Sequence, residues 1–156
     1  MKRHLLLVFL TIFTLYPEIT AKEQFIYTRI SQKEGLSATV NSIYKELDGD
    51  VWIGSPNGLY RFNGSSLFHY TDSLFKELNI LHTQADEEDN FWVLTSSKLI
   101  CRKAGKDVFR EITIPGEDIT GPFPSICHDK TGVWFGSRGK IYCYKYDEGR
   151  LRVFSD

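Results

Sequence analysis

The sequence lacks an excess of charge of either sign and has little proline. Its 156 residues include 19 Lys and Arg against 20 Asp and Glu, and 5 prolines against 12 glycines. The near-neutral balance argues against a nucleic-acid partner and against a membrane-surface partner. Abundant glycine, with aromatic residues at 14% of the chain, suits many short strands joined by tight turns.

Residue patterns typical of catalysis and of metal binding are also missing. The histidines are scattered, and none has a second His or Cys at ligand spacing except in the adjacent pair Cys127-His128, whose side chains would point to opposite faces of a strand. No Gly-rich phosphate loop and no Gly-x-Ser-x-Gly elbow appears. The acidic run at 86–89 is interpreted as a solvated turn, with Ca²⁺ binding as the alternative. We therefore predict no enzyme, no metal site and no cofactor.

The first residues have the order of a secretory signal peptide. Basic residues 2–4 precede the apolar run Leu5–Tyr16, which is shorter than the roughly twenty residues that span a bilayer as a helix. Ala21 supplies a small residue at a cleavage point. We predict a signal peptide over residues 1–21 and a periplasmic mature chain, with an uncleaved anchor as the alternative.

Cysteine is rare and odd in number. Export would place Cys101, Cys127 and Cys143 in an oxidising compartment, where an even set favours a disulfide framework. Each Cys lies within an apolar strand pattern. We interpret all three as small buried hydrophobic residues, with a Cys101–Cys143 bridge as the alternative.

An internal repeat centred on tryptophan is the strongest signal in the chain. The three tryptophans lie 40 and 42 residues apart, at Trp52, Trp92 and Trp134. Each repeat has an alternating apolar strand, the Trp strand, an apolar pair seven and eight residues later, and a fourth strand, with turn residues such as Asp48-Gly49 between them. The first strands are predicted at 40–44, 80–85 and 123–127. Four strands in about 40–45 residues are typical of a propeller blade, whereas helical repeats of that length would show a 3.6-residue period.

The sequence therefore predicts an all-β fold, a partial β-propeller of three four-stranded antiparallel blades. An N-terminal strand at 25–30, within residues 22–35, leads into blades at 36–72, 73–113 and 114–156. Neighbouring blades should cover both faces of the inner strands. We therefore interpret the three tryptophans as structural, and Gly54 and Gly136 as points where backbones approach closely. Three blades cannot close a ring, since closed propellers have about four to eight.

Several segments of the first repeat carry a family resemblance: Leu36-Ser37, Val40–Ile43, Asp48–Ser55 and Asn57–Gly64. They resemble the two-component regulator propeller repeat. The later repeats are looser, with Asp89 and Leu94 at positions where the first repeat has glycine. The resemblance implies the periplasmic sensor region of hybrid two-component histidine kinases of Bacteroidetes, which usually sense oligosaccharides. In that family a transmembrane helix, a kinase and a receiver follow the propellers.

Loops at one end of the blades are the expected place for a ligand. Polar side chains there can hydrogen-bond sugar hydroxyls, and the rings of Tyr70, Phe75 or Phe123 could stack on a sugar. Ordinary solvated loop residues are the alternative. The candidate polar residues from hairpin loops and inter-blade loops are Asn57, Arg138, Asp72, Lys76, Glu117 and Asp118.

The sequence thus predicts the N-terminal sensor portion of an exported hybrid two-component regulator. It would recognise a carbohydrate and relay its presence through the rest of the sensor chain or a homodimer, without chemistry of its own. One alternative is a secreted propeller of a carbohydrate-active enzyme, which would need a carboxylate pair or a His or Tyr base converging on the funnel. Another is a nonfunctional truncated product.

Overall fold

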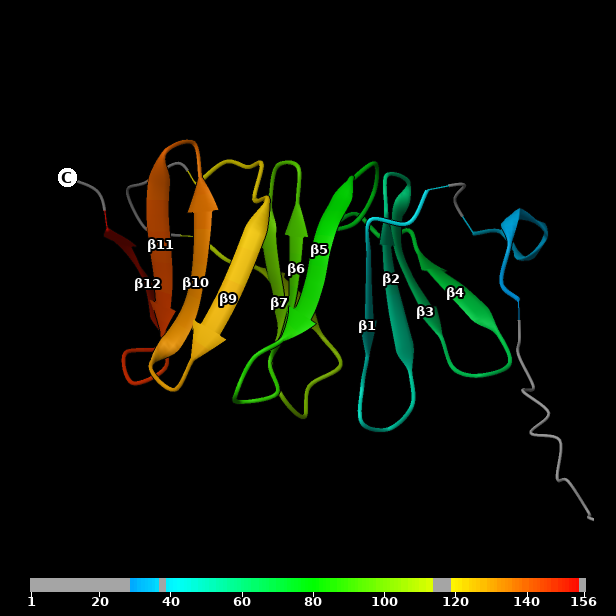
Figure 1. Ribbon diagram of the computed structural model, residues 1–156, viewed down its shortest axis with the longest axis horizontal. Helices are drawn as coiled ribbons and strands as arrows, with labels where there is room; N and C mark the ends of the chain where they lie inside the picture. The colour runs from blue at the N-terminus through cyan, green and yellow to red at the C-terminus, as the bar shows by residue number, and fades with distance from the viewer. Residues whose placement is uncertain (1–28, 37–38, 114–118, 155–156) are drawn as a thin grey trace, which may run out of the picture.

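The computed structural model describes residues 29–36, 39–113 and 119–154. Within them it holds three four-stranded antiparallel sheets, and the single helical element is the short 3-10 turn η1 (Gln32–Glu34). The sheets stand side by side in chain order (Figure 1). This arrangement confirms the predicted all-β fold class with three four-stranded blades.

Each blade is a meander in which consecutive strands pair. Blade 1 consists of β1 (Ser42–Lys45), β2 (Val51–Ser55), β3 (Gly58–Phe62) and β4 (Leu67–Tyr70). Blade 2 consists of β5 (Ile80–Ala85), β6 (Phe91–Thr95), β7 (Leu99–Arg102) and β8 (Phe109–Glu111). Blade 3 consists of β9 (Ser125–Asp129), β10 (Gly132–Ser137), β11 (Lys140–Lys145) and β12 (Arg150–Phe154).

Short turns, several of them at glycine-containing pairs, join the strands of each meander. The β10–β11 turn is the two-residue loop Arg138-Gly139, with φ of 49° and 78°, the left-handed geometry whose twist matches that of the flanking strands. In the β1–β2 turn, Gly49 has a φ of 103°, and the Asp48 carboxylate accepts a hydrogen bond from the Asp50 amide at 3.2 Å. The local sequence therefore determines where each strand ends.

The core lies between the blades, because alternate residues of the middle blade face its two neighbours. The β6 residues Phe91 and Val93 pack with Trp52 of blade 1. Trp92 and Leu94, between and after them, pack against blade 3. All of β6 is buried, as expected for a strand that is covered on both faces.

The repeat tryptophans differ in how they are covered. The Trp52 ring lies 4.9 Å from Phe91 of the next blade, and the Trp92 ring lies 5.2 Å from Tyr144 of the next blade. Trp134 is half-buried and packs on Phe154 of its own blade at 5.1 Å. Trp52 and Trp92 thus each face the following blade, whereas among the described residues none of another blade covers Trp134.

The glycines two residues after Trp52 and Trp134, within the same strands, differ in the same way. A methyl group on Gly54 would lie 2.4 Å from Ser42 Oγ and 2.7 Å from Ile80 Cγ2, so this glycine permits the close approach of blade 2. At Gly136 the nearest atoms would be 3.9 Å away. The expected close approach is therefore wrong for Gly136, which lies on the same uncovered side of blade 3 as Trp134.

The start of the chain only partly falls within the described residues. The predicted signal peptide and most of the predicted strand at 25–30 lie outside them, and Arg29 and Ile30 are not in a strand. The turn η1 follows, with a capping box between Ser31 and Glu34. Two first strands begin two residues later than predicted: β1 begins at residue 42 and β9 at residue 125.

The three cysteines are free. Cys101 packs toward blade 3, whereas Cys143 alternates with the inward-facing Tyr142 and Tyr144 and so lies on the other face of β11. The blade 3 sheet separates the two thiols, which excludes the alternative bridge. The prediction of burial is correct for Cys101 and Cys143. It is wrong for Cys127, which is exposed on the uncovered side of blade 3.

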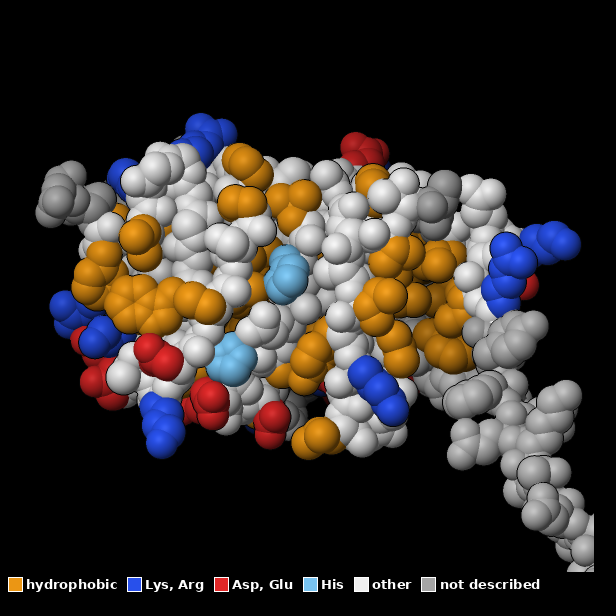
Figure 2. All heavy atoms as spheres, viewed as in Figure 1, with side chains coloured by type: hydrophobic (Ala, Val, Ile, Leu, Met, Phe, Trp, Pro, Cys, Tyr) orange, Lys and Arg blue, Asp and Glu red, His pale blue; other side chains and the backbone are white. Residues whose placement is uncertain are grey.

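The outer faces of the two end blades carry exposed apolar side chains. Figure 2 shows them gathered over β1–β4 at one end and over β10–β12 at the other. Ile43 is 67% exposed on blade 1, and Ile141 is 54% exposed on blade 3. Blade 2 differs because both of its faces lie against neighbouring blades.

Candidate functional site

The loops in which a ligand was expected lie together at one end of the molecule. The β2–β3, β6–β7 and β10–β11 turns are at the upper end in Figure 1, as are the connection between β4 and β5 and the described residues that lead into β9. Of the sequence-predicted residues, Asn57, Arg138, Asp72 and Lys76 are exposed there. Glu117 and Asp118 lie outside the described residues.

Some of these side chains support the loops themselves. Asp72 accepts hydrogen bonds from the Leu74 and Phe75 amides at 2.9 and 3.2 Å. Arg138 Nε donates to the Gly121 carbonyl at 2.9 Å, which ties the β10–β11 turn to the preceding connection. Asp72 and Arg138 therefore combine a structural contact with exposure.

The side chains of the remaining two candidates, Lys76 and Asn57, make weaker or fewer contacts with the protein. Lys76 Nζ lies 3.9 Å from a carboxylate oxygen of its neighbour Glu77, a contact of little energy at an exposed site. The backbone carbonyl of Asn57 accepts a hydrogen bond from the His69 ring at 3.0 Å when that nitrogen is protonated, and its backbone N–H donates to Ser55 Oγ at 3.1 Å. The side-chain amide of Asn57 makes no hydrogen bond within the described part of the chain. No hydrogen bond or ion pair there joins any two of the four candidate residues.

Two of the three proposed stacking rings are not available to a ligand. Phe75 and Phe123 are 1% and 0% exposed, because both fill the spaces between blades. Tyr70 packs against Trp52 at 5.4 Å. The expectation that one of these rings stacks on a sugar is therefore wrong for Phe75 and Phe123, whose apolar loop positions serve the core.

Hydrogen bonds between blades make the upper end a continuous surface. Asn41 Nδ2 donates to the Ile80 carbonyl at 2.7 Å and to Asn79 Oδ1 at 3.0 Å. The Ser96 amide donates to the Asn79 carbonyl, and the Gly121 amide donates to the Ser97 carbonyl. Polar groups of blades 1 and 2, and of the connection to blade 3, are thus fixed relative to one another.

At the opposite end, the acidic run at 86–89 contains a buried carboxylate. Asp86 accepts hydrogen bonds from the Glu88 and Asn90 amides at 2.9 Å and from Trp92 Nε1 at 2.7 Å. The interpretation of this run as a solvated turn is therefore wrong at Asp86, which is 6% exposed. Asp129 holds the corresponding turn of blade 3, and the Thr131 hydroxyl and amide lower the pKa of its carboxyl.

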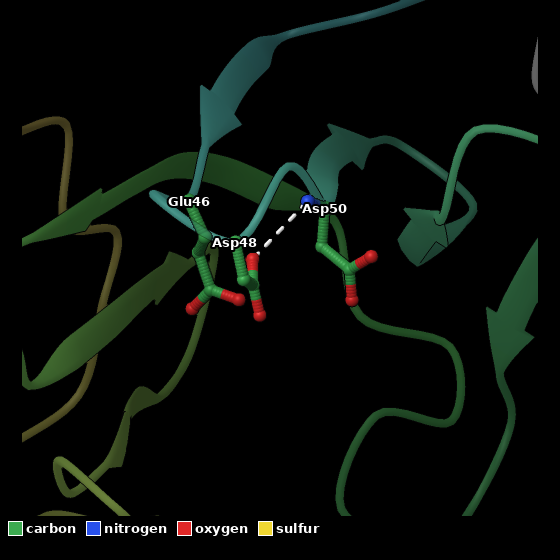
Figure 3. A group of neighbouring side chains, drawn as sticks. All are labelled: Glu46, Asp48 and Asp50. Atoms are coloured by element: carbon green, nitrogen blue, oxygen red, sulfur yellow. Dashed lines mark hydrogen bonds between the residues drawn. The ribbon is translucent and has the colours of Figure 1, made fainter.

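Blade 1 has a group of three carboxylates at the equivalent turn, shown in Figure 3: Glu46, Asp48 and Asp50. Their oxygens come within 4.8 Å of one another. The Arg102 guanidinium pairs with Glu46, and Arg61 Nε lies 3.5 Å from Asp50. Two arginines thus balance two of the three charges, so the group forms inter-blade and intra-blade ion pairs.

Arg102 is a residue that sequence reasoning missed. Its guanidinium lies 5.5 Å from the Trp52 ring centroid and 5.6 Å from that of Phe91, within the range of cation–π attraction. The side chain is 18% exposed and borders a hollow of about 310 Å³ between blades 1 and 2. The signal that could have identified it in the sequence is a charged residue directly after the apolar residues 99–101 of a predicted strand.

Comparison with known proteins gives structural matches of low sequence identity. The extracellular domain of BT3049, described as a hybrid two-component system of B. thetaiotaomicron, matches with a TM-score of 0.66 and 18% identity over 86% of this chain and 19% of that chain. The corresponding domain of BT4673 from the same organism matches with a TM-score of 0.57 and 19% identity. That match covers 74% of this chain and 15% of the BT4673 chain. Virginiamycin B lyase from Staphylococcus aureus matches with a TM-score of 0.58 and 17% identity. That match covers 75% of this chain and 41% of the lyase chain.

Identities this low carry information about architecture alone. The fold is that of a β-propeller. No family model and no curated protein matches the sequence, and the chain spans less than half the length of each of these structures. Among the described residues, no helix is long and apolar enough to cross a membrane.

Proposed function

We propose that this chain is the exported N-terminal propeller portion of a hybrid two-component sensor, which binds an oligosaccharide without transforming it. The observation that carries the proposal is the first repeat, where the segments 48–55 and 57–64 resemble the two-component regulator propeller repeat and form the expected turns and strands β2 and β3. The fold shared with the extracellular domain of BT3049 over 86% of this chain supports it. The rest of the sensor chain or a homodimer would relay the signal.

The proposed ligand surface is the upper end of the blades. Asn57 and Lys76 are exposed there, and the hydrogen bonds that join Asn41, Asn79 and Ser96 hold the underlying loops rigid. A rigid base with exposed amide and ammonium groups suits recognition of sugar hydroxyls, because little ordering entropy is lost on binding. The predicted contacts from Glu117 and Asp118 remain part of the proposal.

A direct binding test uses the full chain and a panel of plant and host oligosaccharides. We expect one class of oligosaccharide to bind, with Asn57→Ala and Lys76→Ala each weakening binding several-fold, measured by calorimetry. Lys130→Ala, at an exposed position outside the ligand-loop surface, is the matched control. The carbohydrate assignment would be contradicted if Lys130→Ala weakened binding as much as Asn57→Ala and Lys76→Ala do. It would also be contradicted if no member of the panel bound.

The same experiment separates a sensor from a propeller enzyme. Virginiamycin B lyase shows that a propeller can carry an enzyme, so each oligosaccharide is recovered after incubation and its mass is measured. A sensor returns the oligosaccharide unchanged. Cleavage products with a new unsaturated or reducing end would favour the carbohydrate-active enzyme.

Export is tested by fusing the chain to a mature β-lactamase that lacks its own leader. We expect cells carrying the fusion to resist ampicillin, and the purified chain to begin at Lys22 by mass spectrometry. Leu7→Arg with Leu10→Arg interrupts the apolar run and should abolish resistance. Leu47→Arg, at a position that is 99% exposed, should leave it intact, and equal resistance in all three fusions would refute export by this segment.

A further inference from the structure

A second hollow lies on the periphery of blade 2, away from the ligand loops. It has a volume of about 500 Å³ and lies along β7 and β8 and the connection between them, and its exposed lining is almost entirely apolar. Cys101, Val108 and Ile112 supply apolar atoms. Cys101 and Ile112 also contact the core between blades 2 and 3, so the hollow opens on the blade 3 side of the sheet.

The hollow follows from one small residue at a repeated position. Arg61 in β3 pairs across the strands with Phe68, and its guanidinium lies 5.4 Å from that ring centroid, which fills the corresponding space in blade 1. The equivalent pair in blade 2 is Cys101 with Arg110. A cysteine side chain is much smaller than an arginine, so it fills less of the space above β7, and Cys101 itself is buried at the base of the hollow.

The rim of the hollow is cationic. Among the described residues, Lys103, Lys106 and Arg110 line it together with a single carboxylate, Asp107. Lys103 Nζ donates to the Tyr144 hydroxyl at 2.8 Å, which anchors that side of the rim to blade 3. The lining therefore has more cations than anions in a chain whose formal net charge is −1.

Arg110 differs from the arginines on the corresponding faces of the other blades. Arg61 lies 3.5 Å from Asp50, and Arg152, which pairs across the strands with Cys143, bonds to Glu148 at 2.6 Å. Within the described residues, no carboxylate pairs with Arg110 or with Lys106. These two charges are therefore available to a ligand.

We propose that this hollow binds a small amphipathic anion of the alkyl carboxylate class. The hydrocarbon chain lies on Cys101, Val108 and Ile112, and the carboxylate meets Arg110 and Lys106. The described residues that line it include no aromatic ring, which favours an aliphatic chain over a stacked ring. The volume falls in the usual range of small-ligand sites. Burial raises the pKa of the Cys101 thiol to about 12, so the thiol is neutral and compatible with a hydrocarbon. This site is independent of the proposed carbohydrate surface.

The experiment titrates decanoate into the full chain below its micelle concentration and follows binding by calorimetry and by methyl NMR. We expect saturable binding that shifts the methyl signals of Val108 and Ile112. The double variant Lys106→Gln with Arg110→Gln should bind about tenfold more weakly, as loss of two exposed ion pairs predicts. Lys45→Gln with Lys130→Gln changes the net charge equally at exposed sites outside the hollow and should bind as the unmodified chain does.

Probes that carry one property of the ligand complete the test. Acetate has the charge without the chain, and decyltrimethylammonium has the chain with the opposite charge; neither should shift the Val108 and Ile112 signals. Val108→Asp should abolish decanoate binding while thermal unfolding stays unchanged, since Val108 is 60% exposed. The proposal is overturned if decanoate does not bind, if the cationic probe binds equally well, or if the two double variants weaken binding alike.

Discussion

A single carboxylate at the start of the β5–β6 turn joins the turn to the repeat tryptophan. Asp86 receives the indole N–H of Trp92 at 2.7 Å and two backbone amides of its own turn. In blade 1 the residue six positions before Trp52 is Glu46, which pairs with Arg102 instead. Trp52 Nε1 is buried and has no hydrogen-bond partner among the described residues. The same position in the repeat thus stabilises a turn in one blade and a contact between blades in another.

The first prediction concerns Asp86→Ala. Removing the carboxylate leaves the Trp92 indole and the turn amides without an acceptor in a buried site, so we expect the free energy of unfolding to fall by about 3 kcal/mol. Urea denaturation measures the change. Asp147→Ala, in an exposed turn, should change it by less than about 0.5 kcal/mol, and equal effects of the two substitutions would show that the Asp86 contacts contribute little.

The second prediction concerns the reactivity of the thiols. Burial raises the pKa of Cys101 to about 12, so at pH 8 this thiol is almost entirely protonated. Burial also raises the pKa of Cys143, and both side chains are shielded from a reagent in solution. Exposed Cys127 should take up iodoacetamide first, and the other two should react after unfolding in urea. Peptide mass spectrometry gives the order, and early modification of Cys101 would contradict its burial.

At the scale of the element, the strands could be predicted because their signals are local. Alternating apolar residues and pairs such as Asn57-Gly58 mark strands and turns within one repeat. β1 begins two residues later than predicted, but the backbone pairing extends further, because the Asn41 amide still donates to the Gly54 carbonyl at 2.8 Å. Assigned strand ends commonly differ by one or two residues. The pairing of Arg102 with Glu46 could not be predicted, because the residues belong to different blades.

The third prediction compares two glycines at the same position of the repeat. Gly54→Ala would place a methyl group 2.4 Å from Ser42 Oγ and 2.7 Å from Ile80 Cγ2, so we expect a loss of about 2 kcal/mol from overpacking between blades. Gly136→Ala meets no atom nearer than 3.9 Å and should be tolerated. Thermal unfolding of both variants is the measurement, and equal destabilisation would show that blade 3 is covered in solution.

At the scale of the whole molecule, blade 2 lies between two neighbours, while blades 1 and 3 each have one face without a neighbouring blade among the described residues. This difference explains where sequence reasoning failed. A repeat pattern shows which side chains point toward a following blade, but burial requires that blade to be present. Trp134 and Cys127 therefore have core patterns and yet are half-buried and exposed. The candidate ligand loops could be located by topology, whereas the contacts of Asp72 and Arg138 depend on loop conformation.

The last prediction uses the tryptophans to report how blade 3 is covered. Variants that keep a single tryptophan are made by Trp→Phe substitution, and acrylamide quenching of the remaining fluorescence is measured. Trp92 is 0% exposed and should be strongly protected, whereas half-buried Trp134 should be quenched several-fold more efficiently and emit at longer wavelength. If Trp134 proves as protected as Trp92, another surface must lie on it, and sedimentation at several protein concentrations then decides whether that surface is a second copy of the chain.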